Sequence, residues 1–365
     1  MRDQNIHIIA AARPNFMKVA PLLHALRATT WAKPKLIHTG QHYDRNMSDA
    51  ILEDLRVPKP DFHLGIGSGS HAEQTGNVMI EYEKICLADK PDWIVVVGDV
   101  NPTAACAMVG AKLWIPVIHL EAGLRSNDRQ MPEEINRLVT DAIADVLWTP
   151  SADADENLAH EGVSAERIDL IGNIMIDSFE MLREKIEASD ERAELGLETG
   201  TYGLVTLHRP SNVDSLDTLG PIVDELVSVS EQLPVVFVAH PRTIKGLETF
   251  GLDEKLKAAK GIKLLDPVPY IRFMNLVTGA RLVITDSGGL QEETTYLRIP
   301  CLTMRENTER PVTVTQGTNK LVNSGNLAGN LASILAGDWA EGEVPPLWDG
   351  KTAERAVEAL KRRCE

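Results

Sequence analysis

Residues 94–99 read Ile-Val-Val-Val-Gly-Asp, a run of apolar, mostly branched side chains that stops at a glycine and a carboxylate. An unbroken apolar run of this kind is typical of a strand covered on both faces, as in a parallel sheet flanked by helices. The carboxyl ends of such strands form the edge at which α/β proteins bind their ligands. We therefore expect Asp99 to lie at a functional edge of a parallel, doubly wound sheet.

Short apolar runs alternate with amphipathic stretches on both sides of this segment. In the first half of the chain, the other predicted strands are Ile6–Ala10, Lys35–Thr39, Val117–Leu120, Val146–Thr149 and Ile168–Ile171. The pattern then begins again, with predicted strands at Gly203–Leu207, Val235–Ala239, Ile262–Leu265, Leu282–Thr285 and Cys301–Met304. This βαβα order predicts an α/β fold with two doubly wound parallel sheets.

The length of the chain agrees with two units. Its 365 residues exceed one ordinary core and suggest two packed domains with a cleft. We expect a first domain over residues 1–172 and a second over residues 173–350. The remaining segment, 351–365, has apolar residues at helical spacing (Ala353, Ala356, Val357 and Leu360) and predicts a terminal helix.

Composition excludes several classes of partner and site. With 37 Lys+Arg against 53 Asp+Glu, the net charge of −16 disfavours nucleic acid and anionic membrane. The sequence has no apolar run approaching 18 residues and no signal-peptide order at its start, so we expect a cytoplasmic protein. Its 4 cysteines are scattered without a C-x-x-C pair, which implies neither a disulfide framework nor a thiolate zinc site.

Carboxylates crowd the strand ends of the first half. Asp99 and Glu121 end apolar strands, and Glu133 and Glu134 open a predicted helix in MPEEINR. Crowding of this kind holds one carboxylate protonated and another ionised, as acid–base catalysis requires. Alternatively, Glu133 and Glu134 simply complement a helix N-terminus after Pro132. A metal site is the rival interpretation, but the usual metal-ligand spacings are absent near these acids, so we expect no metal.

The second half carries a predicted phosphate site. Residues 281–293 run from a buried strand through Ser287, Gly288 and Gly289 into a helix, where backbone N–H groups favour phosphate. Glu292 or Glu293, one turn later, can accept hydrogen bonds from ribose hydroxyls. The alternative is an ordinary tight turn. The loop is not a G-x-G-x-x-G, so a nicotinamide cofactor is not implied.

Other polar residues also fall at predicted strand ends. His208 follows the strand GLVTL and can exchange protons near neutral pH. Isolated cations are usually surface residues, but a set of them can clamp a diphosphate. The candidates for this role are Arg13, Lys18, Arg125, Arg137 and Arg310.

Taken together, the motifs resemble one known family along the whole chain. The specific set is HLEAGLRSNDRQMPEEINR (119–137), TDSGGLQEE (285–293) and TERPVTVTQGTN (308–319), supported by ARPNFMKVAPL (12–22) and TGQHYD (39–44). It is similar to the non-hydrolysing UDP-N-acetylglucosamine 2-epimerases. The resemblance implies a GT-B fold, two Rossmann-like domains with the active site between them and a C-terminal helix crossing back onto the first. It also implies a homodimer without cofactor.

The resemblance assigns roles residue by residue. The implied catalytic residues are Asp99, Glu121, Glu133 and His208. The implied UDP-binding residues are Arg13, Lys18, Ser287, Gly288, Gly289, Glu293 and Arg310. A second, regulatory UDP-GlcNAc site is implied at Gln41, His42, Glu134, Arg209 and His240. One departure is Ala11-Ala12-Arg13-Pro14-Asn15, where the family often reads G-T-R-P-E.

The implied reaction interconverts UDP-GlcNAc and UDP-ManNAc. Loss of the weakly acidic proton at sugar carbon 2 would be coupled to departure of UDP from carbon 1, giving 2-acetamidoglucal, and re-addition would invert carbon 2. This needs an acid and a base on opposite ring faces. Four alternatives remain: a hydrolysing 2-epimerase, epimerisation of a 2,3-diacetamido uronic acid, a GT-B glycosyltransferase, and a non-catalytic UDP-sugar sensor.

Overall fold

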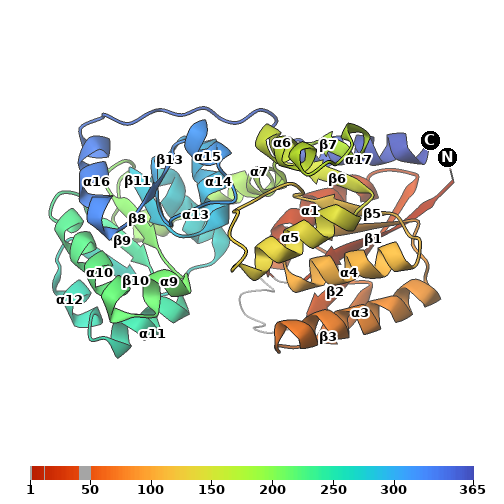
Figure 1. The fold of residues 1–365 in the computed structure, drawn as a ribbon. Helices are drawn as coiled ribbons and strands as arrows, with labels where there is room; N and C mark the ends of the chain where they lie inside the picture. The colour runs from red at the N-terminus through yellow and green to blue at the C-terminus, as the bar shows by residue number, and fades with distance from the viewer. Residues whose placement is uncertain (1, 12, 41–50) are drawn as a thin grey trace. The chain divides into compact units, whose positions relative to one another are not determined.

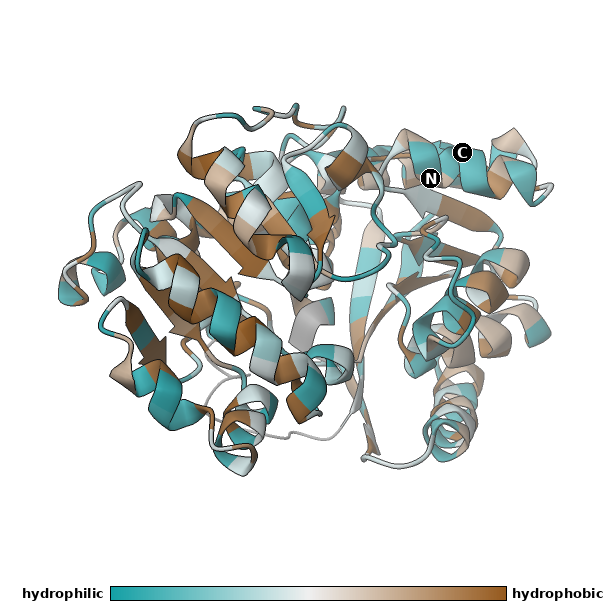
Figure 2. Cartoon of the chain, turned by 60° about the vertical axis from the view of Figure 1, so that its left-hand side comes forward, coloured by the Kyte–Doolittle hydropathy of each residue, from teal (hydrophilic) through white to brown (hydrophobic). Residues whose placement is uncertain are grey.

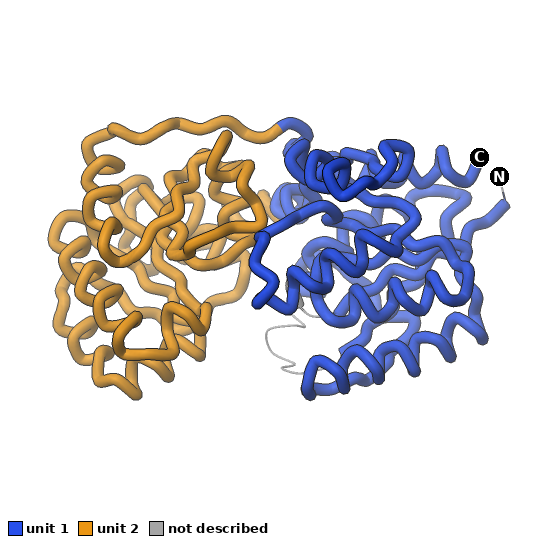
Figure 3. Tube along the Cα trace, viewed as in Figure 1, with its two compact units in different colours: residues 1–181, 346–365 blue, residues 182–345 orange. Residues whose placement is uncertain are grey.

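Each half of the chain builds its own parallel β-sheet. The computed structural model describes residues 2–11, 13–40 and 51–365 (Figure 1). Figure 3 shows two units, which we treat one at a time: unit 1 is Met1–Met181 with Pro346–Glu365, and unit 2 is Leu182–Pro345. The expected boundary at residue 172 comes shortly before helix α7 (Ile174–Glu187), whose Ile174 packs into the core of unit 1.

Unit 1 contains a seven-stranded sheet in the order β3-β2-β1-β4-β5-β6-β7. The strands are β1 (Gln4–Ala10), β2 (Ala32–Gly40), β3 (Phe62–Ile66), β4 (Trp93–Val97), β5 (Val117–Leu120), β6 (Val146–Thr149) and β7 (Ile168–Leu170). All neighbouring strands pair in parallel. The order reverses between β1 and β4, which creates the switch point where such sheets bind ligands.

Helices cover both faces of this sheet, as the apolar β4 predicts. Val95 and Val97 pack into a core with α1 (Arg13–Arg27), whereas Ile94 and Val96 pack into a second core with α3 (His71–Ala88) and α4 (Asn101–Lys112). Further crossover elements among the described residues are α5 (Pro132–Ile143), α6 (Ala152–His160) and the 3₁₀ turn η1 (Ala165–Arg167). The expected doubly wound arrangement is therefore confirmed in unit 1.

Unit 2 contains a six-stranded parallel sheet in the order β10-β9-β8-β11-β12-β13. Its strands are β8 (Gly203–Thr206), β9 (Val235–Val238), β10 (Ile262–Leu265), β11 (Leu282–Thr285), β12 (Cys301–Met304) and β13 (Asn319–Val322). The helical elements are α8 (Glu191–Glu194), α9 (Pro210–Val213), α10 (Leu216–Ser230), α11 (Pro241–Thr249), α12 (Asp253–Ala258), α13 (Tyr270–Gly279), α14 (Gly288–Leu297), α15 (Val312–Thr315), η2 (Ser324–Asn326) and α16 (Leu327–Leu335). Figure 2 shows apolar strands beneath helices of mixed polarity, consistent with burial inside a doubly wound unit.

The last helix, α17 (Thr352–Cys364), packs in unit 1 rather than in the unit that precedes it in sequence (Figure 3). Ala353, Ala356 and Leu360 lie in the same core as α1. The backbone N–H groups of Thr352 and Ala353 donate to the carboxylate of Asp177 at 3.1 and 2.7 Å. Asp177 thus satisfies N–H groups that a helix start leaves without partners.

No helix in the described part of the chain has the length and apolar character needed to cross a membrane.

Candidate active site

The strand ends of unit 1 place the expected carboxylates on turns with left-handed backbone. Gly98 precedes Asp99 with φ of +68°, and Gly123 follows Glu121 with φ of +79°. Glu121 itself has φ of +72°, which is rare for a residue with a side chain and costs about 1 kcal/mol or more. The N–H groups of Glu121 and Ala122 both donate to the Trp148 carbonyl, at 3.1 and 3.0 Å, and hold this turn. Such strain is common at functional sites.

The buried Glu121 carboxylate has a cationic partner. Lys18, on α1, donates from Nζ to Oε2 of Glu121. The other oxygen, Oε1, is buried and has no hydrogen-bond partner among the described residues. Glycine is favoured at position 98 by its φ of +68°, whereas a Cβ there would be in ordinary van der Waals contact, 3.5 Å from Lys18 Nζ and 3.6 Å from Glu121 Oε2. Lys18, expected at the diphosphate, is thus ion-paired with Glu121 in this structure.

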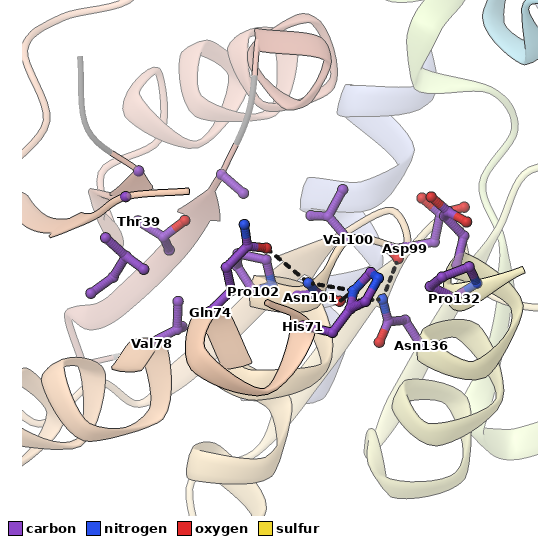
Figure 4. Close-up of a pocket in the computed structure, with 15 residues that line it drawn as sticks. Thr39, His71, Gln74, Val78, Asp99, Val100, Asn101, Pro102, Pro132 and Asn136 are labelled. Carbon is purple, nitrogen blue, oxygen red and sulfur yellow. Dashed lines mark hydrogen bonds between the residues drawn. The ribbon is translucent and has the colours of Figure 1, made fainter. Parts of the chain in front are cut away.

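Asp99 and Glu133 line one pocket of about 340 Å³ in unit 1 (Figure 4). The other lining residues are Ala11, Thr39, Gly40, Ile66, Gly67, His71, Gln74, Val78, Val100, Asn101, Pro102, Pro132 and Asn136. Pro102 and Pro132 each stand in the first turn of a helix, α4 and α5, where the missing N–H costs no hydrogen bond. The structure thus brings Asp99 and Glu133 together, whereas Glu121 is not among the lining residues.

Side-chain amides join the elements along one wall of this pocket, as Figure 4 shows. Asn101 Nδ2 donates to Gln74 Oε1 at 2.9 Å, and Asn136 Nδ2 donates to Asn101 Oδ1 at 3.2 Å. Asn136 Nδ2 also donates to the backbone carbonyl of Asp99 at 2.9 Å. The position of Asp99 is therefore fixed by α5 as well as by its own strand.

Glu134, expected at a regulatory site, is buried in a different environment. Its Oε2 accepts from Ser126 N and Ser126 Oγ, both at 3.0 Å, and from Arg137 Nη2 at 2.6 Å. Its Oε1 accepts from Asn127 N at 2.9 Å. Burial alone would raise the pKa of Glu134, but these donors outweigh it and hold the pKa below its usual range. Every contact that the structure gives Glu134 is thus with its own unit.

In unit 2, His208 and Asp286 form a pair at the ends of β8 and β11. His208 Nδ1 lies 2.8 Å from Oδ1 of Asp286, and the His208 side chain is 40% exposed. The fully buried Asp286 also accepts from Arg209 N at 2.8 Å and from Asn212 Nδ2 at 2.9 Å. Burial opposes ionisation, yet the contact with His208 and the other donors keep the pKa of Asp286 below its ordinary value. Asp286 therefore fixes the orientation of the imidazole.

Two predicted regulatory residues lie beside this pair. Arg209 Nε donates to the Asp286 carbonyl at 3.0 Å. The His240 ring centroid is 5.7 Å from that of His208, and His240 Nδ1 accepts from Arg242 N at 3.2 Å. Gln41 and His42, the other members of this set, lie outside the described residues, and so does the side chain of Arg13, the first residue of α1.

The predicted phosphate loop leads into α14 as expected. Ser287 caps the helix, and its N–H donates to Thr285 Oγ1 at 3.0 Å. A Cβ on Gly289 would meet no atom within 4 Å, so the backbone there is open to a ligand. One turn later, Tyr270 donates to Oε1 of Glu293 at 2.5 Å. Burial raises the pKa of Glu293 to about 7.

Arg310 is held by two carboxylates of the same unit. Its Nε lies 2.7 Å from Glu292 Oε1, and its Nη1 lies 2.5 Å from Glu309 Oε1. Arg305 Nη2 is 2.8 Å from the other oxygen of Glu309. The two arginines and two glutamates balance in charge, so a diphosphate at Arg310 would meet a neutral network rather than a free cation.

Sequence reasoning missed the partners of these residues. Asp286 follows a buried strand directly, the same signal that identified Asp99, but it was assigned no role. Asn136 lies inside the motif at 119–137 but was assigned no role, and Tyr270 belongs to none of the quoted motifs. Arg125 and Arg137, considered for a diphosphate clamp, are each bound to carboxylates of unit 1: Arg125 to Asp141 and Glu161, Arg137 to Asp99 and Glu134.

Comparison with known proteins agrees with these features. A family profile described as UDP-N-acetylglucosamine 2-epimerase matches residues 24–361. The UDP-N-acetylglucosamine 2-epimerase of Methanocaldococcus jannaschii is 42% identical over 97% of this chain and 98% of its own length. A UDP-2,3-diacetamido-2,3-dideoxy-D-glucuronate 2-epimerase of Pseudomonas aeruginosa is 39% identical over 86% of this chain and 87% of its own.

Two solved structures that resemble this chain are also UDP-GlcNAc 2-epimerases. The M. jannaschii UDP-GlcNAc 2-epimerase, in complex with UDP-GlcNAc and UDP, matches with a TM-score of 0.88 at 42% identity, covering 98% of this chain and 99% of that one. The Neisseria meningitidis UDP-GlcNAc 2-epimerase bound to UDP-GlcNAc also has a TM-score of 0.88, at 27% identity, over 98% and 99% of the two chains. The two Rossmann-like units are those of a GT-B-like enzyme fold. The chain belongs to the UDP-N-acetylglucosamine 2-epimerase family.

Proposed function

We propose that this protein is an isomerase that interconverts UDP-GlcNAc and UDP-ManNAc. The observation that carries the proposal is that Asp99 and Glu133, in a chain of this family, line the same pocket at the carboxyl edge of the unit 1 sheet. These two carboxylates come from different elements, the β4–α4 turn and the start of α5. Two such groups can approach opposite faces of a sugar ring, as inversion at carbon 2 requires.

The reaction proceeds by elimination and re-addition. A carboxylate takes the proton from carbon 2, the C–H electron pair forms the C1=C2 bond, and UDP leaves with the C1–O pair. Re-addition of UDP to carbon 1, with a proton delivered to the opposite face of carbon 2, gives the epimer. Coupling to UDP departure is essential, because a carboxylate alone is too weak a base for this C–H bond.

The ion pairs suggest the proton roles. Asp99 and Glu121 each contact one cation, Arg137 and Lys18 respectively, whose positive charge balances that of the carboxylate. Glu133 has no such contact among the described residues and is partly exposed. In the forward direction Asp99 is therefore the base and Glu133 the acid, and the roles exchange in the reverse direction. Glu121, which is ion-paired with Lys18 and does not line the pocket, has an electrostatic role in this proposal.

Unit 2 would bind the nucleotide. The open backbone at Gly289 and the start of α14, after Ser287 and Gly288, suit a phosphate, and Glu293 can accept from ribose hydroxyls. His208, oriented by Asp286, would stabilise charge developing on the departing diphosphate. Arg13, Lys18 and Arg310 complete the proposed UDP set, with Lys18 shared with Glu121.

A regulatory UDP-GlcNAc site is proposed at Gln41, His42, Glu134, Arg209 and His240. The adjacency of His240 and His208 in unit 2 supports it, because a ligand at one ring would influence the other. If the site acts, UDP-ManNAc alone is epimerised slowly until a trace of UDP-GlcNAc is added. Hyperbolic kinetics with either UDP-GlcNAc or UDP-ManNAc as substrate, without activation by UDP-GlcNAc, would refute the regulatory site.

The test of the reaction is proton NMR of the purified protein with UDP-GlcNAc in deuterated water. We expect UDP-ManNAc to appear, deuterium to enter carbon 2 of the product, and 2-acetamidoglucal with UDP to accumulate slowly. Asp99→Asn and Glu133→Gln should lose about 10²–10⁴ in rate while keeping UDP affinity. Protium retained at carbon 2 through many turnovers, or full activity of both variants, would defeat the mechanism.

A second candidate substrate follows from the 39% identity to the P. aeruginosa enzyme, which is named for a diacetamido uronate. The same NMR assay with UDP-2,3-diacetamido glucuronate distinguishes the two, since the preferred substrate has the higher kcat/KM. Release of free ManNAc would instead identify a hydrolysing enzyme.

We also propose a homodimer through the helical layer of α3, α4 and α5 in unit 1. Ile80 and Leu87 on α3, Trp114 after α4 and Ile135 on α5 are exposed apolar residues. Large apolar side chains exposed on neighbouring helices are typical of a protein–protein interface.

A further inference from the structure

The guanidinium group of Arg137 connects two carboxylates of unit 1. Arg137 is only 2% exposed. Its Nε and Nη2 donate to Oε2 of Glu134 at 3.0 and 2.6 Å, and its Nη1 donates to Oδ2 of Asp99. Glu134 lies three residues earlier on the same helix, so the two side chains meet on one face of α5. The planar guanidinium can therefore hold one carboxylate while it presents a hydrogen to the other.

Glu134 is itself fixed, and this fixes the orientation of Arg137. The loop before α5 supplies Ser126 N, Ser126 Oγ and Asn127 N as donors to the Glu134 carboxylate. With the two Arg137 donors, five hydrogen bonds converge on this group. A carboxylate with five donors stays charged and cannot rotate away without leaving buried N–H groups unsatisfied.

Asp99 is held at two points and keeps one oxygen available. Its backbone carbonyl accepts from Asn136, and its Oδ2 accepts from Arg137. Within the described residues, Oδ1 accepts no hydrogen bond, and the side chain is 32% exposed and lines the pocket. The oxygen bound to the guanidinium is thus distinct from the oxygen that a substrate hydrogen can reach.

We propose that Arg137 is a positioning residue for the epimerisation proposed above: it holds Oδ2 of Asp99 and thereby aims Oδ1 at the hydrogen on carbon 2. The proton from carbon 2 goes to Oδ1, the C–H electron pair enters the C1=C2 bond, and UDP departs with the C1–O pair. Arg137 neither gains nor loses a proton, because guanidinium stays charged throughout. This inference rests on the proposed function, since it assigns Arg137 a task only if Asp99 moves the proton.

The test uses Arg137→Ala and Arg137→Lys in the full chain. For Arg137→Ala we expect kcat to fall about 10²-fold, as misplacement of a reacting group does, with the Kd for UDP by calorimetry unchanged. Guanidinium chloride at a non-denaturing concentration should restore kcat about tenfold by filling the vacated site, whereas tetramethylammonium chloride should not, because it cannot donate. Arg137→Lys keeps the charge without the planar fork and should fall between wild type and Arg137→Ala in kcat.

A matched control is Arg355→Ala, because Arg355 also joins parts of unit 1, donating from Nε to the Ile171 carbonyl at 2.6 Å. This control should lower the melting temperature without changing kcat.

A kcat for Arg137→Ala near that of wild type, or a loss that guanidinium does not reverse, would overturn the inference. If Arg137→Ala fails to fold, Arg137→Lys decides: lower kcat at unchanged UDP affinity supports the inference, and wild-type kcat overturns it. Failure of wild type to epimerise UDP-GlcNAc would overturn the proposed function, a result separate from any Arg137 outcome.

Discussion

Two adjacent glycines at the start of α14 have different surroundings. A Cβ on Gly288 would lie 2.7 Å from Glu309 Oε1 and 3.0 Å from Arg310 Nη1, inside the charged network. A Cβ on Gly289 would meet nothing within 4 Å. Substitution at Gly288 therefore strains the protein itself, whereas substitution at Gly289 obstructs only what binds there.

This difference gives a test of the phosphate loop. Gly289→Val should weaken UDP binding at least about tenfold with little change in melting temperature, because a side chain blocks close approach of phosphate to the backbone. Gly288→Ala should lower the melting temperature as well, because Glu309 or Arg310 must move. Calorimetry with UDP and thermal melts separate the two effects. UDP binding to Gly289→Val with wild-type affinity would refute the loop assignment.

Glu293 predicts a pH dependence of stability. Its folded-state pKa of about 7 lies above the ordinary value of 4.5, so the folded state binds the proton more tightly. The resulting stabilisation is fully present below about pH 4.5, declines as pH rises, and is lost above about pH 7, a change of about 3 kcal/mol. Urea unfolding at several pH values should show this loss in wild type and not in Glu293→Gln. If the free energy of unfolding changes with pH in the same way for wild type and Glu293→Gln, this prediction is wrong.

At this scale, the sequence predicts where the acids lie but not what holds them. Asp99 and Glu121 could be placed because each lies within two residues of the end of an apolar strand. Their partners could not, because Lys18 is 103 residues from Glu121 and Arg137 is 38 residues from Asp99 in the chain. Which cation meets which carboxylate depends on how α1 and α5 cross the sheet, and no local pattern encodes that crossing.

At the scale of elements, burial decides which helices the sequence reveals. Strand β4 was evident because both of its faces are buried. Helix α3 was missed because it buries three residues, Val78, Tyr82 and Cys86, spaced by four, which leaves a narrow apolar stripe on a long helix. In the structure, α3 begins with a capping box formed by Ser70 and Glu73. Strand β3 was missed because its FHLGI sequence is short and interrupted by Gly65, whose φ is +67°.

Docking of α17 depends on one carboxylate. Burial raises the pKa of Asp177, and both of its carboxylate oxygens are used: Oδ2 accepts from the Thr352 N–H and Oδ1 from the Ala353 N–H. Asp177→Ala should lose about 1–2 kcal/mol, because both N–H groups lose their acceptor. Asp177→Asn should lose less, because its amide oxygen still accepts from one N–H group while its NH2 group faces the other. Urea unfolding measures the difference, and limited proteolysis before residue 352 should accelerate more in Asp177→Ala than in Asp177→Asn. Equal stability of the Ala and Asn variants would refute the capping role.

At the scale of the whole molecule, exposed apolar surface is distributed unevenly over the helices of unit 1. The Leu87 and Trp114 side chains are 70% and 91% exposed, and Trp114 has φ of +57°. Leu87 lies in the last turn of α3 and Trp114 follows the end of α4, and these neighbouring crossover helices run in the same direction because the sheet is parallel. An exposed tryptophan on a strained backbone, such as Trp114, adds nothing to the stability of an isolated unit. We therefore expect it to pack against a second copy of the chain.

If this helical layer forms the dimer, removing its apolar anchors should separate the copies. The double variant Leu87→Glu with Trp114→Asn replaces both anchors, and Asn tolerates the left-handed backbone at position 114. Light scattering after size exclusion should give twice the 40.1 kDa chain mass for wild type and the single-chain mass for the variant. Leu216→Glu is the matched control, because Leu216 is 51% exposed on α10 of unit 2 and its substitution should leave the dimer intact. A variant that remains dimeric would place the interface elsewhere, and a wild-type protein of single-chain mass would refute the dimer.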